Sequence, residues 1–410
     1  MNILYIDHYA GSIKYGRSFR PYYLGQEWKK DGHRLVVVGG TYSHIRNIQP
    51  KHPGVEMIDG ITYIWLKTPK YKGNGIGRVW SMIVFMLKLF FSLRKILNIA
   101  EPNVIIGSTV YMLDMYPAWL MKKLSSKRTK LIFELHDIWP LTLIELGNIS
   151  RFHPFIILLK ITELWTYKVV DVVVSILPKT FSYVKKFGIK EPQFFYIPNG
   201  IVVEDWKKSE PLPKEHQTII HALKESGKFL VGYAGSHSIA NALTDVIDVA
   251  IELQNQKLLD IHFILVGGGQ EKENLIKYAY SKGINNITFV DRISKLAIPE
   301  FLKQMDVLYI GLQKKMLFQY GVSANKIFDY MMAGRPILQT IFTGGDIIKE
   351  AKCGVSVESG EIKDIVKALL ELKNMPKHTL RELGKNGQTC VIKEYDYKIL
   401  AKDFLNAIKI

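Results

Sequence analysis

Short apolar runs alternate with stretches of helical periodicity along the whole chain. In the first half these runs predict strands at residues 3–7, 35–38, 62–66, 104–107, 131–135, 172–176 and 194–197. The second half repeats the pattern, with strands predicted at residues 230–234, 262–266, 288–290, 307–310, 337–339 and 355–357. Apolar strands that alternate with helices are typical of parallel sheets built from βαβ units. The pattern therefore predicts an α/β protein with two doubly wound domains.

A charged stretch with several prolines separates the two halves. Residues 199–216 interrupt the periodicity, as linkers between domains do. We therefore expect an N-terminal domain at residues 1–198 and a C-terminal domain at residues 217–394. Ligands of doubly wound sheets bind beyond the carboxyl ends of the strands, so polar residues at those ends are the candidates for a site.

The stretch Tyr320–Pro336 is the first candidate, because it joins two predicted strands through a short helix. Ser323 and Asn325 are cap-type residues, so we expect the helix to begin there and to run to about residue 333. Lys326 would then stand in the first turn. A cation is unfavourable at that end of the helix dipole unless an anion accompanies it.

A helix start, a lysine and a carboxylate together suit a nucleotide diphosphate. Backbone amides at a helix start hold phosphate oxygens. The amides expected to do so are those of Gly321, Val322, Ser323 and Asn325. Lys326 would bind the same phosphates, and Asp329, three residues further on, would reach a diol such as ribose. An ordinary βα unit with an exposed Lys–Asp pair explains the same spacing equally well.

Glycine turns follow other predicted strands and can bring the backbone close to a phosphate. The turn residues and the one cation that we expect to meet a nucleotide there are Gly11, Ser12, Gly235, Ser236, His237, Gly267 and Arg292. No G-x-G-x-x-G motif follows the first strand, and no acidic residue ends the second strand. These absences argue against a dinucleotide-dependent dehydrogenase.

The fifth predicted strand ends in ELHDIWP, which places Glu134, His136 and Asp137 at a strand end. A histidine beside a carboxylate is suited to proton transfer or to binding a sugar hydroxyl. A purely structural hydrogen bond between His136 and Asp137 is the alternative.

Composition narrows the class of protein. The chain has 410 residues, of which 48% are hydrophobic, and only two cysteines, Cys353 and Cys390. It therefore has enough apolar residues for folded domains and no disulfide scaffold, which fits a reducing cytoplasm. The chain opens on a strand pattern, so we expect no signal peptide. A net charge of +17 calls for an anionic partner: nucleic acid, anionic lipid or phosphorylated small molecules.

Part of this charge surrounds one apolar helix, predicted at residues 78–97. No Asp or Glu occurs between Ile61 and Ala100, whereas seven Lys and Arg do. Such a helix can lie in a membrane interface, and burial against a sheet is the alternative. Lys88 interrupts it, and its apolar runs are too short to span a bilayer. Nucleic acid is disfavoured, because the cations flank an apolar helix and do not alternate with stacking aromatics.

The segments FELHDIWPLTLIELG, FFYIPNGI and GVSANKIFDYMMAGRPI resemble family-4 glycosyltransferases of the GT-B fold, and among them a WbuB-like bacterial subgroup. The resemblance covers essentially the whole chain. It implies two Rossmann-like domains facing across a deep cleft, with a nucleotide-diphosphate sugar on the C-terminal domain and the acceptor on the N-terminal one. It also implies transfer with retention, no metal, and a final helix at residues 395–410 that packs back on the N-terminal domain.

The resemblance also assigns residues. Asp329 matches the second Glu of the family's Glu-x7-Glu signature, which holds the ribose, whereas the first Glu falls at Gly321. GSHSIANAL replaces the family's usual Arg and Lys after the first strand of the second domain. His136 matches a histidine that faces the donor sugar, and Arg17 is expected at the donor. The residues expected at the acceptor are Arg20, Glu134 and Trp139.

The expected reaction is the transfer of an amino or N-acetylamino deoxyhexose from a UDP-linked donor to a lipid-linked glycan in surface polysaccharide synthesis. The enzyme would need no cofactor and would sit on the cytoplasmic face of the plasma membrane. Lys326 would neutralise the leaving diphosphate, and Asp137 would fix the tautomer of His136. Two alternatives remain: a sugar-nucleotide epimerase of similar fold, and a non-catalytic sugar-nucleotide-binding protein, which the missing signature Glu suggests.

Overall fold

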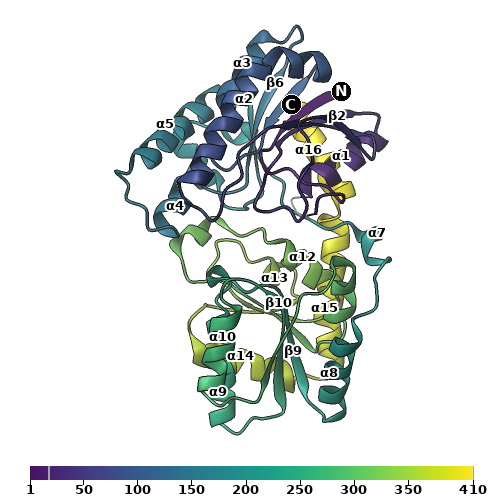
Figure 1. The fold of residues 1–410 in the computed structure, drawn as a ribbon. Helices are drawn as coiled ribbons and strands as arrows, with labels where there is room; N and C mark the ends of the chain where they lie inside the picture. The colour runs from purple at the N-terminus through teal and green to yellow at the C-terminus, as the bar shows by residue number, and fades with distance from the viewer. Residues whose placement is uncertain (17–18, 410) are drawn as a thin grey trace. The chain divides into compact units, whose positions relative to one another are not determined.

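The computed structural model describes residues 1–16 and 19–409. The chain divides into two compact units: Met1–Asn199 together with Tyr397–Ile410, and Gly200–Asp396. Each unit contains one largely parallel sheet with helices on both faces (Figure 1). The predicted α/β architecture with two doubly wound domains is confirmed.

The sheet of the first unit has eight strands in the order β3-β4-β2-β1-β5-β6-β7-β8. Its strands are β1 Asn2–Ile6, β2 Arg34–Gly40, β3 Gly54–Ile58, β4 Ile61–Leu66, β5 Val104–Gly107, β6 Lys130–Leu135, β7 Val172–Ser175 and β8 Phe194–Tyr196. The strand order reverses between β1 and β5. In doubly wound sheets such a reversal opens a crevice beyond the carboxyl ends of the two strands.

The sequence prediction missed β3, the edge strand that pairs antiparallel with β4. Asp59 and Gly60 form the two-residue turn between them, with φ values of 49° and 82°. Positive φ at both positions is the requirement of a type I′ hairpin turn, which Asp-Gly satisfies well. The Asp-Gly pair was therefore the available signal for this strand.

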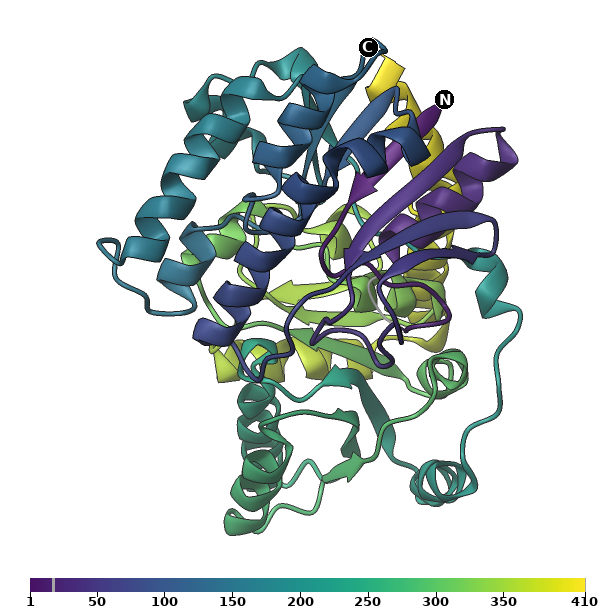
Figure 2. The same cartoon turned by 45° about the horizontal axis from the view of Figure 1, so that its top comes forward.

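Helices cover both faces of the first sheet. They are α1 Arg20–Lys30, α2 Ile76–Ala100, α3 Met115–Leu124, α4 Leu141–Glu145, α5 Pro154–Val169, α6 Phe181–Val184, η1 Lys185–Phe187, η2 Glu191–Gln193 and α16 Tyr397–Lys409. Figure 2 shows α16 alongside α1, on the opposite face of the sheet from α2 and α3. The indole N–H of Trp28 donates to the carbonyl of Ala401 over 3.0 Å. The last helix is thereby built into the core of the first unit.

Helix α2 is buried along one stripe only. Met82, Phe85 and Leu89 are buried at helical spacing, whereas Phe91 is 85% exposed and Trp80 is 55% exposed. Its mean hydropathy reaches 1.6, so by length and composition alone it could cross a membrane, although 28% of that window is buried. The prediction that its uninterrupted apolar runs are too short to span a bilayer stays a prediction, because length and average hydropathy do not by themselves place a helix across a membrane.

The second sheet has six parallel strands in the order β11-β10-β9-β12-β13-β14. They are β9 Phe229–Ser236, β10 Ile261–Gly268, β11 Ile287–Val290, β12 Val307–Gly311, β13 Ile337–Thr340 and β14 Gly354–Val357. The order reverses between β9 and β12. Residues of the predicted linker pack into this unit, since Ile201, Trp206 and Leu212 are buried in its core.

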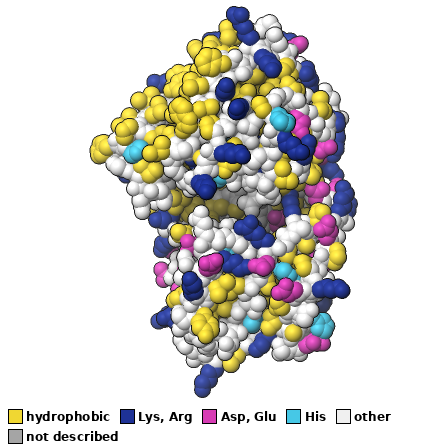
Figure 3. All heavy atoms as spheres, in the orientation of Figure 1, with side chains coloured by type: hydrophobic (Ala, Val, Ile, Leu, Met, Phe, Trp, Pro, Cys, Tyr) yellow, Lys and Arg dark blue, Asp and Glu magenta, His cyan; other side chains and the backbone are white. Residues whose placement is uncertain are grey.

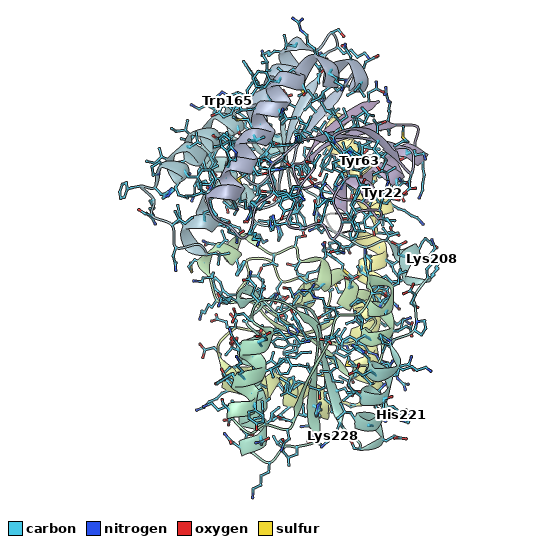
Figure 4. All side chains as sticks on the ribbon, in the orientation of Figure 1. Tyr22, Tyr63, Trp165, Lys208, His221 and Lys228 are labelled. Carbon is cyan, nitrogen blue, oxygen red and sulfur yellow. The ribbon has the colours of Figure 1, made fainter. Side chains whose placement is uncertain are left out.

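Two hydrophobic cores flank the second sheet. The helices of this unit are α7 Val203–Trp206, α8 Lys214–Glu225, η3 Ile239–Asn241, α9 Leu243–Asn255, α10 Lys272–Ser281, η4 Lys295–Ala297, α11 Ile298–Leu302, η5 Met316–Tyr320, α12 Asn325–Met332, α13 Ile347–Glu350, α14 Ile362–Asn374 and α15 Lys377–Glu394. Figure 4 labels Lys228 and His221 at the end of the unit where the strands begin. The candidate residues described next belong to the opposite, carboxyl ends.

Candidate functional site

In the first unit, the strand register gathers polar residues at the switch point. Ile6 pairs with Gly107, and Gly107 pairs with Phe133. The residues that follow these three on β1, β5 and β6 are Asp7, Ser108 and Glu134. Neighbouring strand ends therefore place a hydroxyl and two carboxyl groups along one edge.

His136 joins this group from the end of β6. Its Nε2 lies 2.9 Å from Oε2 of Glu134 and 2.7 Å from Oγ of Ser108. Glu134 is fully buried, and its Oε1 accepts from Nε of Arg20 over 2.8 Å. Burial by itself would raise the pKa of Glu134, but Arg20 and His136 hold it well below its usual range. Glu134 is therefore an anion with internal partners.

Among the hydrogen bonds of the described residues, none joins Asp137 to His136. Its Oδ1 accepts from the amide of Ile138 over 2.8 Å and from the hydroxyl of Thr142 over 2.5 Å. These bonds fasten the turn before α4. The expectation that Asp137 fixes the tautomer of His136 is corrected, because Glu134 occupies that place.

The three residues expected at the acceptor are all buried. Arg20 uses its guanidinium within the unit, donating to Glu134 and to the carbonyls of Ile197 and Pro198. This geometry favours a structural place for Arg20 and Glu134 over direct acceptor contact. The ring of Trp139 lies in the core with the Arg78 guanidinium 5.5 Å from its centroid.

The glycine turn after β1 is the next candidate, and the hydroxyl of Tyr63 donates to the carbonyl of Gly11 over 3.1 Å. Ser12 is fully buried, its carbonyl accepts from the amides of Tyr15 and Gly16, and its hydroxyl has no partner among the described residues. A phosphate cradle at Gly11 and Ser12 stays a prediction. Arg17, expected at the donor, lies outside the described residues.

Asp7 is a residue that the sequence reasoning missed. It is almost fully buried, its Oδ1 accepts from the amide of Tyr9 over 2.9 Å, and burial raises its pKa to about 6. Its position directly after the first strand was the available signal, since that is where a doubly wound sheet carries ligands.

In the second unit, helix α12 begins as predicted but is capped differently. The N-cap is Ala324, whose backbone is extended and which provides no side-chain hydrogen bond. Asn325 is already the first helical residue, so neither Ser323 nor Asn325 is the N-cap residue. Gly321 has φ of 100°, a value that favours glycine. The first amides of α12 therefore have no side-chain cap from the N-cap position.

Lys326 projects from the first turn toward the end of β9. Its ammonium lies 2.5 Å from Oδ1 of Asn241, 3.1 Å from the hydroxyl of Tyr233, and 4.8 Å from the centroid of the Tyr233 ring. Burial lowers the pKa of Lys326 to about 7. Among the described residues no carboxylate forms an ion pair with it. A cation held only by neutral groups suits an anionic ligand.

Backbone close to this lysine is kept free of side chains. A Cβ at Gly235 would lie 2.8 Å from the hydroxyl of Tyr233 and 3.4 Å from Nζ of Lys326. Gly267 has φ of 149°, and a Cβ there would overlap the carbonyl of Gly235. The carbonyl of Ser236 accepts from both Tyr233 and Asn241. These glycines therefore let β9 and β10 end close to the lysine.

His237 and Arg292 stand at the same strand ends. His237 is fully buried, and neither ring nitrogen has a partner among the described residues. Burial lowers the pKa of His237 to about 4, and the charges of Lys272, Arg292 and Lys326 add to this shift. The Arg292 guanidinium lies against Gly268, on the end of β10. The charges of these three cations thus favour a neutral imidazole at His237.

Asp329 lies one turn beyond Lys326 and has a separate set of partners. Burial raises its pKa to about 6, although the charge of Lys295 and a hydrogen bond from the Trp206 side chain act against this. Lys326 and Asp329 form no ion pair in the described chain. The simple Lys–Asp pair that the spacing also allowed is therefore not formed.

Among residues 1–16 and 19–409, no group of three or more His, Cys, Asp or Glu side chains is placed to hold a metal ion. Metal independence stays a prediction.

Two family profiles match the sequence. The profile described as Glycosyltransferase Family 4 matches residues 20–205. The profile described as Glycosyl transferases group 1 matches residues 216–389. Together the two profiles cover most of the chain, which is a glycosyltransferase of the GT-B fold whose N-terminal half matches family 4.

Solved structures with the fold of this glycosyltransferase include three enzymes or complexes of low sequence identity. Sucrose-phosphate synthase from Thermosynechococcus elongatus is 14% identical with a TM-score of 0.74, over 99% of this chain and 98% of its own. HepE from Anabaena, in complex with UDP and glucose, is 14% identical with a TM-score of 0.66, over 100% and 99%. WaaG, a glycosyltransferase involved in lipopolysaccharide biosynthesis, is 13% identical with a TM-score of 0.67, over 100% and 99%.

A comparison with curated protein sequences gives no match. At the identities of the solved structures, the likeness establishes the fold of this glycosyltransferase and leaves its substrates to be argued from its own residues.

Proposed function

We propose that this glycosyltransferase moves a sugar, with retention, from a UDP-linked donor to a lipid-linked glycan acceptor. The observation that carries the donor half is Lys326, a buried ammonium whose hydrogen-bond partners among the described residues are neutral and which lies in the first turn of α12, where the N-cap residue Ala324 provides no side-chain hydrogen bond. The HepE structure was solved with UDP and glucose, which supports a uridine nucleotide here. An amino or N-acetylamino deoxyhexose as the sugar rests on the sequence resemblance to the WbuB-like subgroup.

The second unit would stabilise the leaving group. The bond between C1 of the sugar and the β-phosphate oxygen breaks, and negative charge develops on that phosphate. We expect Lys326 and the first amides of α12 to stabilise this charge, since the ammonium of Lys326 is largely buried and a helix start favours anions. Asp329 would accept hydrogen bonds from the ribose hydroxyls. With this charge compensation, the proposed reaction requires no metal and no other cofactor.

The first unit would hold the acceptor. A hydroxyl of the acceptor attacks C1 from the face that the phosphate leaves, and its proton passes to the departing phosphate oxygen. No side-chain nucleophile is needed in this scheme. His136 is the partly exposed member of the strand-end group, so it is the residue that we place against a sugar hydroxyl.

We also propose that the enzyme works in the cytoplasm and binds peripherally to the inner face of the plasma membrane. Figure 3 shows hydrophobic side chains gathered over α2, α3 and α5, with cations among them. The exposed apolar residues of this surface include Phe91 on α2, Ile161 on α5 and Phe152 before α5. Apolar groups flanked by cations suit an anionic leaflet, where a lipid-linked acceptor is presented.

The membrane proposal is tested by charge reversal. Lys88, Arg94 and Lys95 are exposed on α2, and each cation near an anionic surface contributes about 1 kcal/mol. The triple change to Glu should release the enzyme from vesicles that contain anionic lipid in a flotation assay. The same reversal at Lys377, Lys385 and Lys393 of α15 is the matched control and should leave binding nearly unchanged. Undiminished binding of the α2 variant would assign the exposed face to another role.

Incubation with UDP-sugars, with and without a polyprenyl-diphosphate saccharide, tests the reaction. Transfer requires both substrates and gives a product that keeps the anomeric configuration of the donor. A new sugar nucleotide formed without acceptor would identify an epimerase. Stabilisation of the protein by the sugar nucleotide with no product under either condition would identify a binding protein.

A further inference from the structure

Four side chains surround the carboxyl group of Glu134 at the strand ends of the first unit. Oε1 of Glu134 accepts from Nε of Arg20, and Oε2 faces Tyr5, Ser108 and His136. These partners come from β1, from the end of β5, from the end of β6 and from α1. A carboxylate buried by four separate elements fixes the direction of every proton around it.

The charge state of Glu134 determines those directions. An ionised carboxylate only accepts hydrogen bonds, so Tyr5, Ser108 and Arg20 must all donate to it. If Nε2 of His136 carried a lone pair, that lone pair would face the carboxylate oxygen across 2.9 Å and be repelled. The proton of the neutral ring is therefore on Nε2, pointing inward. Oγ of Ser108, 2.7 Å from Nε2, accepts a share of the same proton.

The opposite nitrogen of the ring follows from this assignment. A neutral imidazole carries one N–H, so Nδ1 of His136 keeps its lone pair. The hydrogen bonds that the described residues make to the His136 ring are both at Nε2. The side chain of His136 is 24% exposed, whereas that of Glu134 is 0% exposed. Nδ1 is thus the hydrogen-bond acceptor that this buried group offers to a ligand.

We propose that Glu134 is a positioning residue that locks His136 as the Nε2–H tautomer, so that Nδ1 accepts a hydrogen bond from a substrate hydroxyl. The proposal rests on the proposed transferase function for the identity of the hydroxyl, which belongs to a sugar. It gives the buried Arg20–Glu134 pair a purpose beyond stability, since Arg20 keeps the carboxyl group ionised. It also gives a role to the carboxylate that stands two residues before the histidine, on the same face of the strand end.

The tautomer can be measured directly on the full chain. Nitrogen-15 NMR of histidine-labelled protein distinguishes the two neutral tautomers by the shifts and couplings of the ring nitrogens, and a His136→Gln variant identifies the signals of His136. At a pH where the ring is neutral, the wild type should show Nε2 protonated and Nδ1 unprotonated. The opposite pattern would overturn the proposal. This measurement needs no substrate, so it remains valid even if the transferase assignment fails.

The variant Glu134→Gln tests the function of the lock. The side-chain amide keeps the shape but can donate to Nε2, which moves the ring proton to Nδ1 and removes the acceptor. We expect the tautomer signals to change and kcat/KM for transfer to fall about 100-fold, within the range typical of one positioned proton-transfer or hydrogen-bonding group. Restoration of both by Glu134→Asp would support the proposal further. A variant that loses its tautomer but keeps full transfer would overturn it.

A matched control is available in the same unit. Glu163 is also fully buried, and it accepts from Lys160 over 2.7 Å and from the hydroxyl of Tyr183 over 2.6 Å. Glu163→Gln removes a buried charge of the same kind and should leave the His136 signals and transfer unchanged. If Glu134→Gln alone fails to fold, the double variant Arg20→Met/Glu134→Gln removes both charges and permits the same two measurements.

Discussion

In the first unit the buried charge of Glu134 is matched by Arg20 and by three further donors, whereas in the second unit the partners of the Lys326 ammonium among the described residues are Asn241 and Tyr233, both neutral. Both charges lie at the carboxyl ends of parallel strands. Burial acts on both, but the pKa of Glu134 is held low by its partners, while the pKa of Lys326 falls to about 7.

The difference separates two uses of a buried charge. A carboxylate whose charge is compensated by internal partners needs no ligand, and it sets the direction of the hydrogen bonds that neighbouring groups donate to it. Burying an ammonium without a counter-ion costs free energy. A bound anion removes part of that cost, so the buried ammonium contributes to the affinity for the anion. We therefore infer that the cluster around Glu134 orients His136, whereas the cluster around Lys326 binds an anionic ligand.

The largest effect should come from breaking the compensated pair. Arg20→Met leaves Glu134 buried without its cation, and loss of one partner of a buried ion pair costs about 3–5 kcal/mol. Six of the seven tryptophans lie within residues 1–199, so urea unfolding followed by tryptophan fluorescence reports mainly on this unit. Arg20→Met/Glu134→Gln should recover most of the lost free energy of unfolding. A single variant as stable as the wild type would show that the pair is not compensating.

Removing the uncompensated ammonium should have the opposite signature. Lys326→Ala should lower kcat/KM by about 10²–10³-fold, as loss of one charge-stabilising group does. The thermal unfolding temperature without ligand should be unchanged or slightly raised, because the substitution removes a buried cation that has no counter-ion. Lys228→Ala, at the amino end of the same strands (Figure 4), is the control and should change neither. Near-normal turnover of the Lys326 variant would end its assignment to the phosphates.

The positions of these charges show what sequence could and could not predict. The strands follow from their apolar runs, and helix α12 lies within the stretch where it was expected. Glu134 was also predictable as the partner of His136, because residues two apart at a strand end share a face, whereas the adjacent Asp137 does not. The contact of Lys326 with Asn241, 85 residues away, was not, since it depends on how β9 and α12 pack.

Titration sharpens the comparison between the two clusters. Lys326 has a pKa of about 7 in the free protein against an ordinary value of 10.5, so its charge is present below pH 7 and lost above it. Affinity for UDP should therefore fall above pH 7, by at most tenfold per pH unit, with protons taken up on binding. Stability of the free protein should rise over the same interval, because the unfolded chain binds the proton more tightly.

Calorimetric titration of UDP between pH 7 and 9 measures this dependence. Asp329 and His237, with pKa values of about 6 and 4, titrate below that interval. Lys326→Arg keeps its charge throughout, so its affinity for UDP should be level across the same range. An equal slope in the wild type and in the Arg variant would assign the titration to another group.

The smallest effect is expected at Asp329, whose carboxylate already faces Lys295. Asp329→Asn keeps the shape and weakens the hydrogen bonds to the ribose, so the KM for the donor should rise about tenfold with kcat little changed, as loss of about 1.5 kcal/mol does. A donor with 2′-deoxyribose supplies the matching change in the ligand. The wild type should bind this donor less well than the ribose donor, whereas the variant should hardly distinguish them. If the variant keeps the full preference for ribose, Asp329 serves only as the counter-ion of Lys295, and the second cluster recognises phosphate without reading the sugar of its nucleotide.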